Sequence, residues 1–112
     1  MKWFISQPMK DLSDYEIQQK RIEIEEYIKK YDPNSEILDS FFADEVESKN
    51  PGVKYLAKSL DLLAEADRAY FASGWRGARG CKIEHDVAVA YGIPYIQECR
   101  IDDGVYRHIF NI

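Results

Sequence analysis

The segment RAYFASGWRGARGCKIEHDVAVAYG, residues 68–92, carries the strongest fold signal in this chain. Its first part, residues 68–73, is a short run of aromatic and small apolar residues and predicts a β-strand. Residues 74–80 contain three glycines and predict a loop. In residues 81–91 apolar side chains recur at helical spacing, and Gly92 is a typical C-terminal stop. The segment therefore predicts a strand, a glycine-rich loop and a helix in succession.

The same alternation continues on both sides of this segment. The other predicted elements are strands at 2–7, 36–42 and 94–98, a candidate fifth strand at 105–110, and helices at 13–31 and 51–66. Ser13 and Glu16 form a capping-box pattern at the start of the first helix. Strands that alternate with helices favour a parallel α/β sheet with right-handed crossovers. We therefore expect one α/β domain over residues 1–112, a three-layer fold with a four- or five-stranded, mainly parallel sheet.

The composition excludes several classes of protein. The chain has 112 residues and a formal net charge of −5, and an acidic balance argues against binding of long nucleic acid, which depends on Lys and Arg. No run approaches the roughly 20 apolar residues that cross a bilayer, so no membrane partner is expected. Two cysteines make no disulfide framework. We expect a reduced, cytoplasmic protein.

The 74–80 loop is the most informative place to look for a ligand, because open parallel sheets bind ligands beyond the carboxyl ends of their strands. Gly74 and Gly80 allow backbone N–H groups to approach a ligand closely, and the helix that follows offers free N–H groups. Arg76, Arg79 and Lys82 add three positive charges. This combination suits a phosphate or another anion. A plain strand-to-helix turn with solvated arginines is the alternative.

Glu84 is the candidate reactive residue. It falls in the first turn of the predicted helix at 81–91, beside the core face formed by Ile83 and Val87. A carboxylate near a helix N-terminus tends to stay ionised, which is the state that a nucleophile or a hydroxyl-binding group needs. A favourable N-terminal glutamate that faces water is the alternative interpretation.

Other candidates lie in the first loop and beside Gly74. The first loop offers polar groups and a cation through Ser6, Gln7, Pro8, Met9 and Lys10, although turn and packing roles also explain Pro8 and Met9. Trp75 could stack on a base or a sugar, or cover the edge of the core.

A zinc site is an alternative that the cysteines and histidines raise. Cys81 and His85 have i, i+4 spacing, and Cys99 and His108 would have to complete the set. Because only the first pair has local metal spacing, we predict no metal ion and no cofactor.

Several of these motifs occur together in one known family. They are Phe4 to Lys10, Glu65-Ala66-Asp67 before a strand, Gly74-Trp75 through Arg79-Gly80-Cys81 to Glu84, Ala88, and Tyr91 to Pro94. In this order they resemble the nucleoside 2-deoxyribosyltransferase-like superfamily, especially its small bacterial and phage members of unassigned function. The resemblance extends from Phe4 to about Ile96, and the ordered set is fairly specific for the fold.

The resemblance implies a flavodoxin-like, Rossmann-like domain that acts on or binds a nucleoside or nucleotide at its N-glycosidic bond. In active members a glutamate attacks the anomeric carbon of the sugar, and Glu84 matches that glutamate. The 74–80 loop matches the region that holds the 5′-hydroxyl or 5′-phosphate, where Arg76 and Arg79 favour the phosphate. No cofactor is implied. Relatives are commonly homo-oligomers, and candidate interface residues are Phe41, Phe42, Tyr55 and residues 106–112.

Two positions depart from the family pattern. Phe4 stands where active members usually have a tyrosine, and Ser59 stands where they usually have an aspartate. Two functions follow as hypotheses: an N-glycosidase or deoxyribosyltransferase that acts on a (deoxy)nucleoside 5′-monophosphate, or a module that binds a nucleotide derivative without turnover. An interaction domain that uses the acidic loop at 42–49 is a third.

Overall fold

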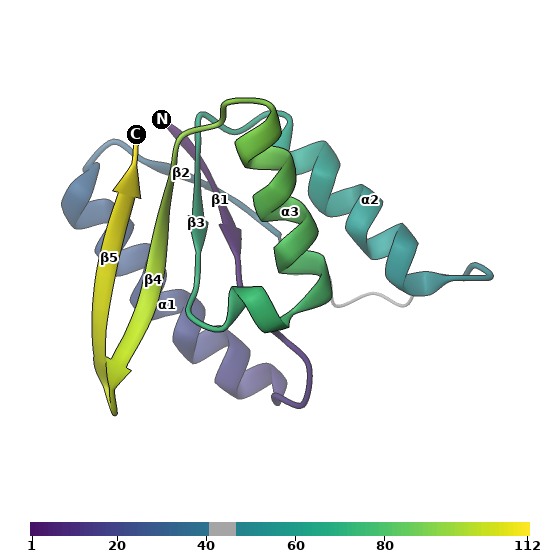
Figure 1. Ribbon diagram of the computed structural model, residues 1–112, viewed down its shortest axis with the longest axis horizontal. Helices are drawn as coiled ribbons and strands as arrows, with labels where there is room; N and C mark the ends of the chain where they lie inside the picture. The colour runs from purple at the N-terminus through teal and green to yellow at the C-terminus, as the bar shows by residue number, and fades with distance from the viewer. Residues whose placement is uncertain (41–46) are drawn as a thin grey trace.

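The computed structural model describes residues 1–40 and 47–112 and contains one five-stranded sheet in the order β2-β1-β3-β4-β5. The strands are β1 (Lys2–Ser6), β2 (Glu36–Leu38), β3 (Arg68–Phe71), β4 (Tyr95–Asp102) and β5 (Val105–Asn111). The first four are parallel to one another, and β5 runs antiparallel to β4 (Figure 1). The predicted α/β fold with a mainly parallel sheet is confirmed, and its strand order is that of flavodoxin-like folds.

Helices cover both faces of the sheet and complete three layers (Figure 1). Helix α1 (Asp14–Tyr31) packs on one face, and α2 (Pro51–Leu63) and α3 (Arg79–Ala90) pack on the other. Successive residues of a strand point to opposite faces, which is why β1 contributes to two cores. Trp3 and Ile5 pack against α1, whereas Phe4 packs against α2 and α3.

Local signals fix where α1 and α2 begin. The Ser13 hydroxyl accepts a hydrogen bond from the Glu16 N–H at 3.1 Å, and the Glu16 carboxylate accepts one from the Ser13 N–H at 3.2 Å. The predicted capping box is therefore present. Asn50 caps α2 through its side chain, with Pro51 at the first helical position.

The structure differs from the predicted elements mainly at three places, besides shifts of one to three residues at the other element ends. Strand β2 ends at Leu38, and the rest of the predicted strand includes Phe41 and Phe42, which lie outside the described residues. Strand β4 continues to Asp102 rather than ending at Glu98, because β5 pairs with it along its length. Helix α3 begins at Arg79, after a short 3-10 turn, η1 (Trp75–Gly77), that the glycine content had suggested only as a loop. Within the described ranges, no helix has the length and apolar character needed to cross a membrane.

Candidate functional site

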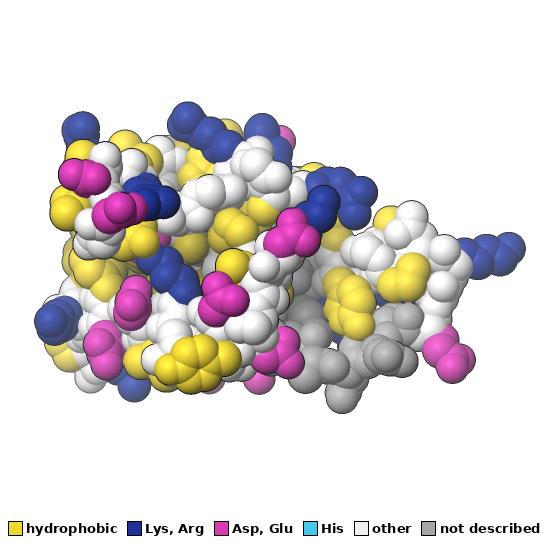
Figure 2. Space-filling view, turned by 90° about the horizontal axis from the view of Figure 1, so that it is seen from below, with side chains coloured by type: hydrophobic (Ala, Val, Ile, Leu, Met, Phe, Trp, Pro, Cys, Tyr) yellow, Lys and Arg dark blue, Asp and Glu magenta, His cyan; other side chains and the backbone are white. Residues whose placement is uncertain are grey.

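A cleft of about 930 Å³ opens at the carboxyl end of β1, between α2 and α3. Figure 2 looks at the molecule from the side on which β1 and β3 end. Nine of the predicted site residues line the cleft: Ser6, Gln7, Pro8, Met9, Lys10, Gly74, Arg79, Gly80 and Glu84. A volume of this size lies at the upper end of the range of about 300–1,000 Å³ that is usual for small-molecule sites.

Glu84 joins three elements that are distant in the sequence. Its side chain extends from α3 and is 6% exposed. The Ser6 hydroxyl, at the end of β1, donates a hydrogen bond to Glu84 Oε1 at 2.7 Å, and the Ser59 side chain on α2 is also hydrogen-bonded to this carboxyl group. The carboxylate is therefore held by two hydroxyl groups on the wall of the cleft.

The environment of Glu84 differs from the one predicted. Because α3 begins at Arg79, Glu84 lies in the second turn of the helix, where the helix N-terminus stabilises a charge less. Burial raises the pKa of Glu84 to about 6, while the hydrogen bonds from Ser6 and Ser59 act in the opposite direction. Burial therefore outweighs helix position for Glu84, although a carboxyl group with a pKa of about 6 is still mostly ionised at neutral pH.

Cys81 lies one helical turn before Glu84 and also lines the cleft. Burial raises the pKa of its thiol to about 11, although a hydrogen bond with Ser6 lowers it. Because the thiolate is the reactive form of cysteine, a neutral buried thiol is a poor nucleophile. Glu84 is thus the better candidate for covalent chemistry in this cleft.

The two arginines of the 74–80 loop have different surroundings. Arg79 lines the cleft, and its Nη2 lies 3.6 Å from the position that a Cβ on Gly52, at the start of α2, would occupy. Arg76 instead places its guanidinium over the Trp75 ring, 5.1 Å from the ring centre, and is not among the described residues that line the cleft. The structure therefore brings Arg79 to the site but not Arg76.

Trp75 belongs to the core and does not line the cleft. It is 5% exposed and stacks on His85, with the ring centres 3.9 Å apart and the planes at 22°. Phe71 packs against the same two rings. The alternative in which Trp75 covers the core edge matches this geometry, and stacking of Trp75 on a ligand base does not.

The start of α3 leaves backbone groups open to a ligand. Ala78, its N-cap residue, makes no capping hydrogen bond through its side chain, so the first N–H groups of the helix lack that partner. Gly74 has a φ of 86°, a left-handed conformation that favours glycine, and it lies against Pro8 of the first loop. A Cβ on Gly77 or Gly80 would meet nothing within 4 Å. These two glycines leave the backbone uncovered where a ligand could approach.

Helix α2 supplies residues that were not predicted as part of the site. Tyr55, Leu56 and Ser59 line the cleft, and Ser59 contacts Glu84. A signal for them existed in the sequence, because Leu56, Ser59 and Leu63 fall on one face of the helix. From the sequence, Ser59 was predicted only as a departure from the family pattern, and Tyr55 only as a candidate interface residue.

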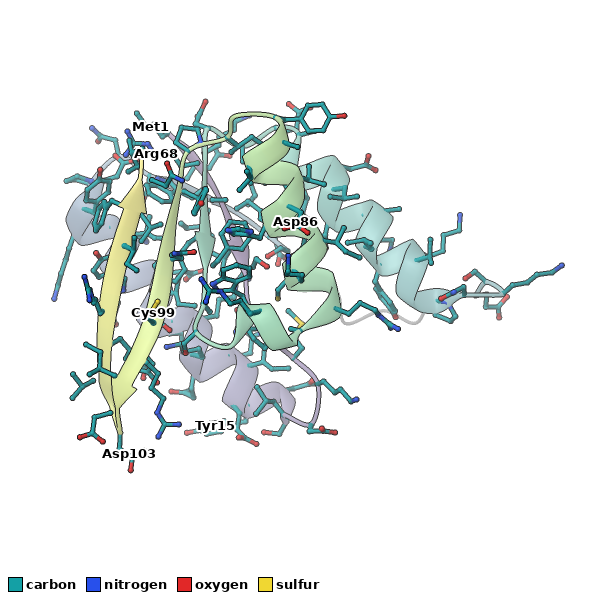
Figure 3. All side chains as sticks on the ribbon, in the orientation of Figure 1. Met1, Tyr15, Arg68, Asp86, Cys99 and Asp103 are labelled. Carbon is teal, nitrogen blue, oxygen red and sulfur yellow. The ribbon has the colours of Figure 1, made fainter. Side chains whose placement is uncertain are left out.

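The zinc alternative has no support among the described residues. Within residues 1–40 and 47–112, no three His, Cys, Asp or Glu side chains lie close enough together to hold a metal ion. His85 is enclosed by aromatic rings on the α3 face, and His108 stacks on Tyr27 of α1 on the opposite face. Figure 3 shows Cys99 on β4, which is a different element from the α3 helix that carries Cys81.

Comparison with known proteins does not extend this description: no family model matches the chain, and no curated protein sequence matches it.

Proposed function

We propose that this protein binds a (deoxy)nucleoside 5′-monophosphate in the cleft and hydrolyses its N-glycosidic bond. The observation that carries the proposal is the placement of Glu84, a buried carboxylate on the cleft wall between the hydroxyls of Ser6 and Ser59. A Glu84 oxygen attacks C1′ of the sugar, and the base leaves with the electron pair of the C1′–N bond and is protonated from solvent. Water then hydrolyses the glycosyl ester and restores the carboxylate.

The surroundings of the cleft suit a phosphate group. Arg79 and Lys10 both line it, and the open start of α3 adds backbone N–H donors and the positive end of the helix dipole. Asp11 and Glu84 also line the cleft, so its positive charge is local to Lys10, Arg79 and the helix start, on a protein with a net charge of −5. The phosphate of a mononucleotide is thus a better fit than the backbone of a long nucleic acid.

One observation favours the second candidate function, binding without turnover. Phe4 is 1% exposed and lines the cleft with a ring that carries no hydroxyl. A tyrosine hydroxyl, which the resembled family usually has at this position, is therefore missing beside the nucleophile. Ser59 supplies a hydroxyl to Glu84 from the other side, which is why we favour slow hydrolysis over binding alone. The homo-oligomer that the resemblance implies stays a prediction.

Base release from a nucleoside 5′-monophosphate is the direct test of hydrolysis. At high protein concentration we expect free base to appear, measured by chromatography, and we expect the Glu84→Gln variant to release none, because an amide is not a nucleophile here. Glu65→Gln is the matched control, since Glu65 is an exposed glutamate outside the cleft. If no nucleotide of a broad panel is cleaved by the unaltered protein, hydrolysis is rejected and binding without turnover remains.

The two arginines allow a matched test of phosphate binding by thermal unfolding. A mononucleotide at about 100 times its dissociation constant should stabilise the protein by about 2.7 kcal/mol. Arg79→Ala should remove most of that stabilisation, because a hydrogen-bonded charge contributes about 1.5–3 kcal/mol to binding. Arg76→Ala removes the same charge three residues away and should retain the effect, because Arg76 lies over Trp75. Equal losses in both variants would show that the arginines act only through net charge.

A further inference from the structure

A second buried carboxylate, Glu98 on β4, lies on the α1 face of the sheet, outside the cleft. It is 5% exposed, and both of its oxygens have partners. Oε1 accepts from the Lys20 ammonium at 2.7 Å and from the backbone N–H of Ser73 at 3.1 Å, and Oε2 accepts from the Tyr70 hydroxyl at 2.5 Å. Burial alone would raise the pKa of Glu98, but these contacts outweigh it and hold the pKa below its usual value. Glu98 is therefore a satisfied, buried charge.

The Ser73 amide lies where the pairing between β3 and β4 ends. The last paired residues are Phe71 of β3 and Gln97 of β4. Beyond this point β4 pairs only with β5, and the two strands form a ribbon whose turn lies at Asp103 (Figure 3). The Glu98 side chain takes the place of the missing backbone acceptor. Ser73 is partly buried, and an N–H that is shielded from water without a partner is costly, so this contact has a structural reason to exist.

Ser73 is directly followed by the wall of the cleft. The Ala72 N–H donates to the carbonyl of Ser6 at 2.9 Å, and the Trp75 N–H donates to the carbonyl of Ala72 at 3.2 Å. The next bonds join Gly77 to Gly74 and Ala78 to Trp75. The turn at 74–78 is thus tied together internally and anchored in the core by Trp75, and its backbone connection to the sheet passes through residues 72 and 73. One attachment is to β1 beside Ser6, and the other is Glu98.

We infer that Glu98 is a positioning residue for the cleft: through the Ser73 amide it fixes the 74–79 wall relative to Glu84, and Lys20 and Tyr70 hold Glu98 in place. The inference rests on one part of the proposed function, namely that the cleft is the ligand site. The contacts themselves run from Lys20 on α1 and Glu98 on β4 to the turn that precedes Arg79, the first residue of α3. Neither Glu98 nor Lys20 lines the cleft, so their influence on a ligand passes through the backbone.

Amide hydrogen exchange of the unliganded protein tests this inference. In Glu98→Ala we expect the hydrogen-bonded amides of Ser73, Trp75, Gly77 and Ala78 to exchange roughly ten- to a hundredfold faster, the range that loss of a hydrogen bond to a charged group gives. The control is Ile24→Ala, which creates a cavity in the core on the same face of the sheet. The exchange rates of the two variants are compared at temperatures that lie equally far below each variant's melting temperature. A residue that only supports the fold would accelerate exchange equally in both variants, and that result would overturn the inference.

Lys20→Met provides a second, milder variant if Glu98→Ala does not fold. Lys20 is partly exposed, with 23% of its side chain accessible, and the variant leaves the contact between Glu98 and Ser73 in place. We expect a smaller acceleration confined to residues 73–80, and no local acceleration would contradict the inference. Because no ligand is used, this result is independent of base release. Failure of hydrolysis would reject the proposed function and leave the positioning role to be judged on exchange alone.

Discussion

Glu84→Gln is expected to stabilise the free protein near neutral pH while it abolishes base release. The pKa of Glu84 is raised from 4.5 to about 6 by burial, so the folded protein binds this proton more tightly than the unfolded chain. Stability is therefore lost as the pH rises from below 4.5 to above 6. A difference of this size corresponds to about 2 kcal/mol at neutral pH. Glutamine carries no charge and avoids this cost, and its amide oxygen can still accept from Ser6.

The pH dependence distinguishes this explanation from a general packing effect. Urea unfolding at about pH 4.5 and about pH 7.5 should show a stability gain for Glu84→Gln that grows toward the higher pH by about 1.6 kcal/mol. Glu65→Gln, at an exposed position, should show no such growth. A gain that is equal at both pH values would mean that Glu84 titrates normally in the folded protein, and its assignment as a buried functional carboxylate with a raised pKa would then fail.

The fold was predictable because its signals are local. The capping box of Ser13 and Glu16 and the alternation of strands with helices are set by neighbours in sequence, and all the predicted helices are present. The length of β4 was not predictable in this way, because residues beyond Glu98 become a strand only by pairing with β5. Likewise, no local pattern distinguishes a 3-10 turn from an open loop in a segment that contains Gly74, Gly77 and Gly80.

The site was predictable only in part, for the same physical reason. Ser6 and Glu84 lie at a strand end and near a helix start, two places where the topology of a parallel sheet gathers residues. The contact of Ser59 with Glu84 depends instead on how α2 packs beside α3, which is a tertiary property. The sequence alone does not distinguish Arg76 from Arg79, but Arg76 belongs to the 3-10 turn and Arg79 is the first residue of α3. In a turn, unlike a helix, no fixed period tells which side chain faces the ligand.

Trp75→Ala is expected to destabilise the protein by about 3–5 kcal/mol, the range for removing a large buried aromatic side chain. The ring is 5% exposed and packs in one core cluster with Phe4, Phe71 and Tyr95, and it stacks on His85. Its loss leaves a cavity behind the wall of the cleft. Urea or thermal unfolding measures the loss directly, and Trp75→Phe should recover a large part of it because an aromatic ring again fills the space.

The comparison with Arg76→Ala separates the core role of Trp75 from a ligand-binding role. Arg76 rests on the outer face of the same ring at 5.1 Å, and its removal exposes the indole without opening a cavity. We expect that variant to cost less than about 1 kcal/mol, as exposed cation–π contacts do. If Trp75→Phe is as stable as the unaltered protein but binds a mononucleotide many times more weakly, the indole itself contacts the base. The ligand site would then have to extend from the cleft across η1, and Arg76 would become part of it.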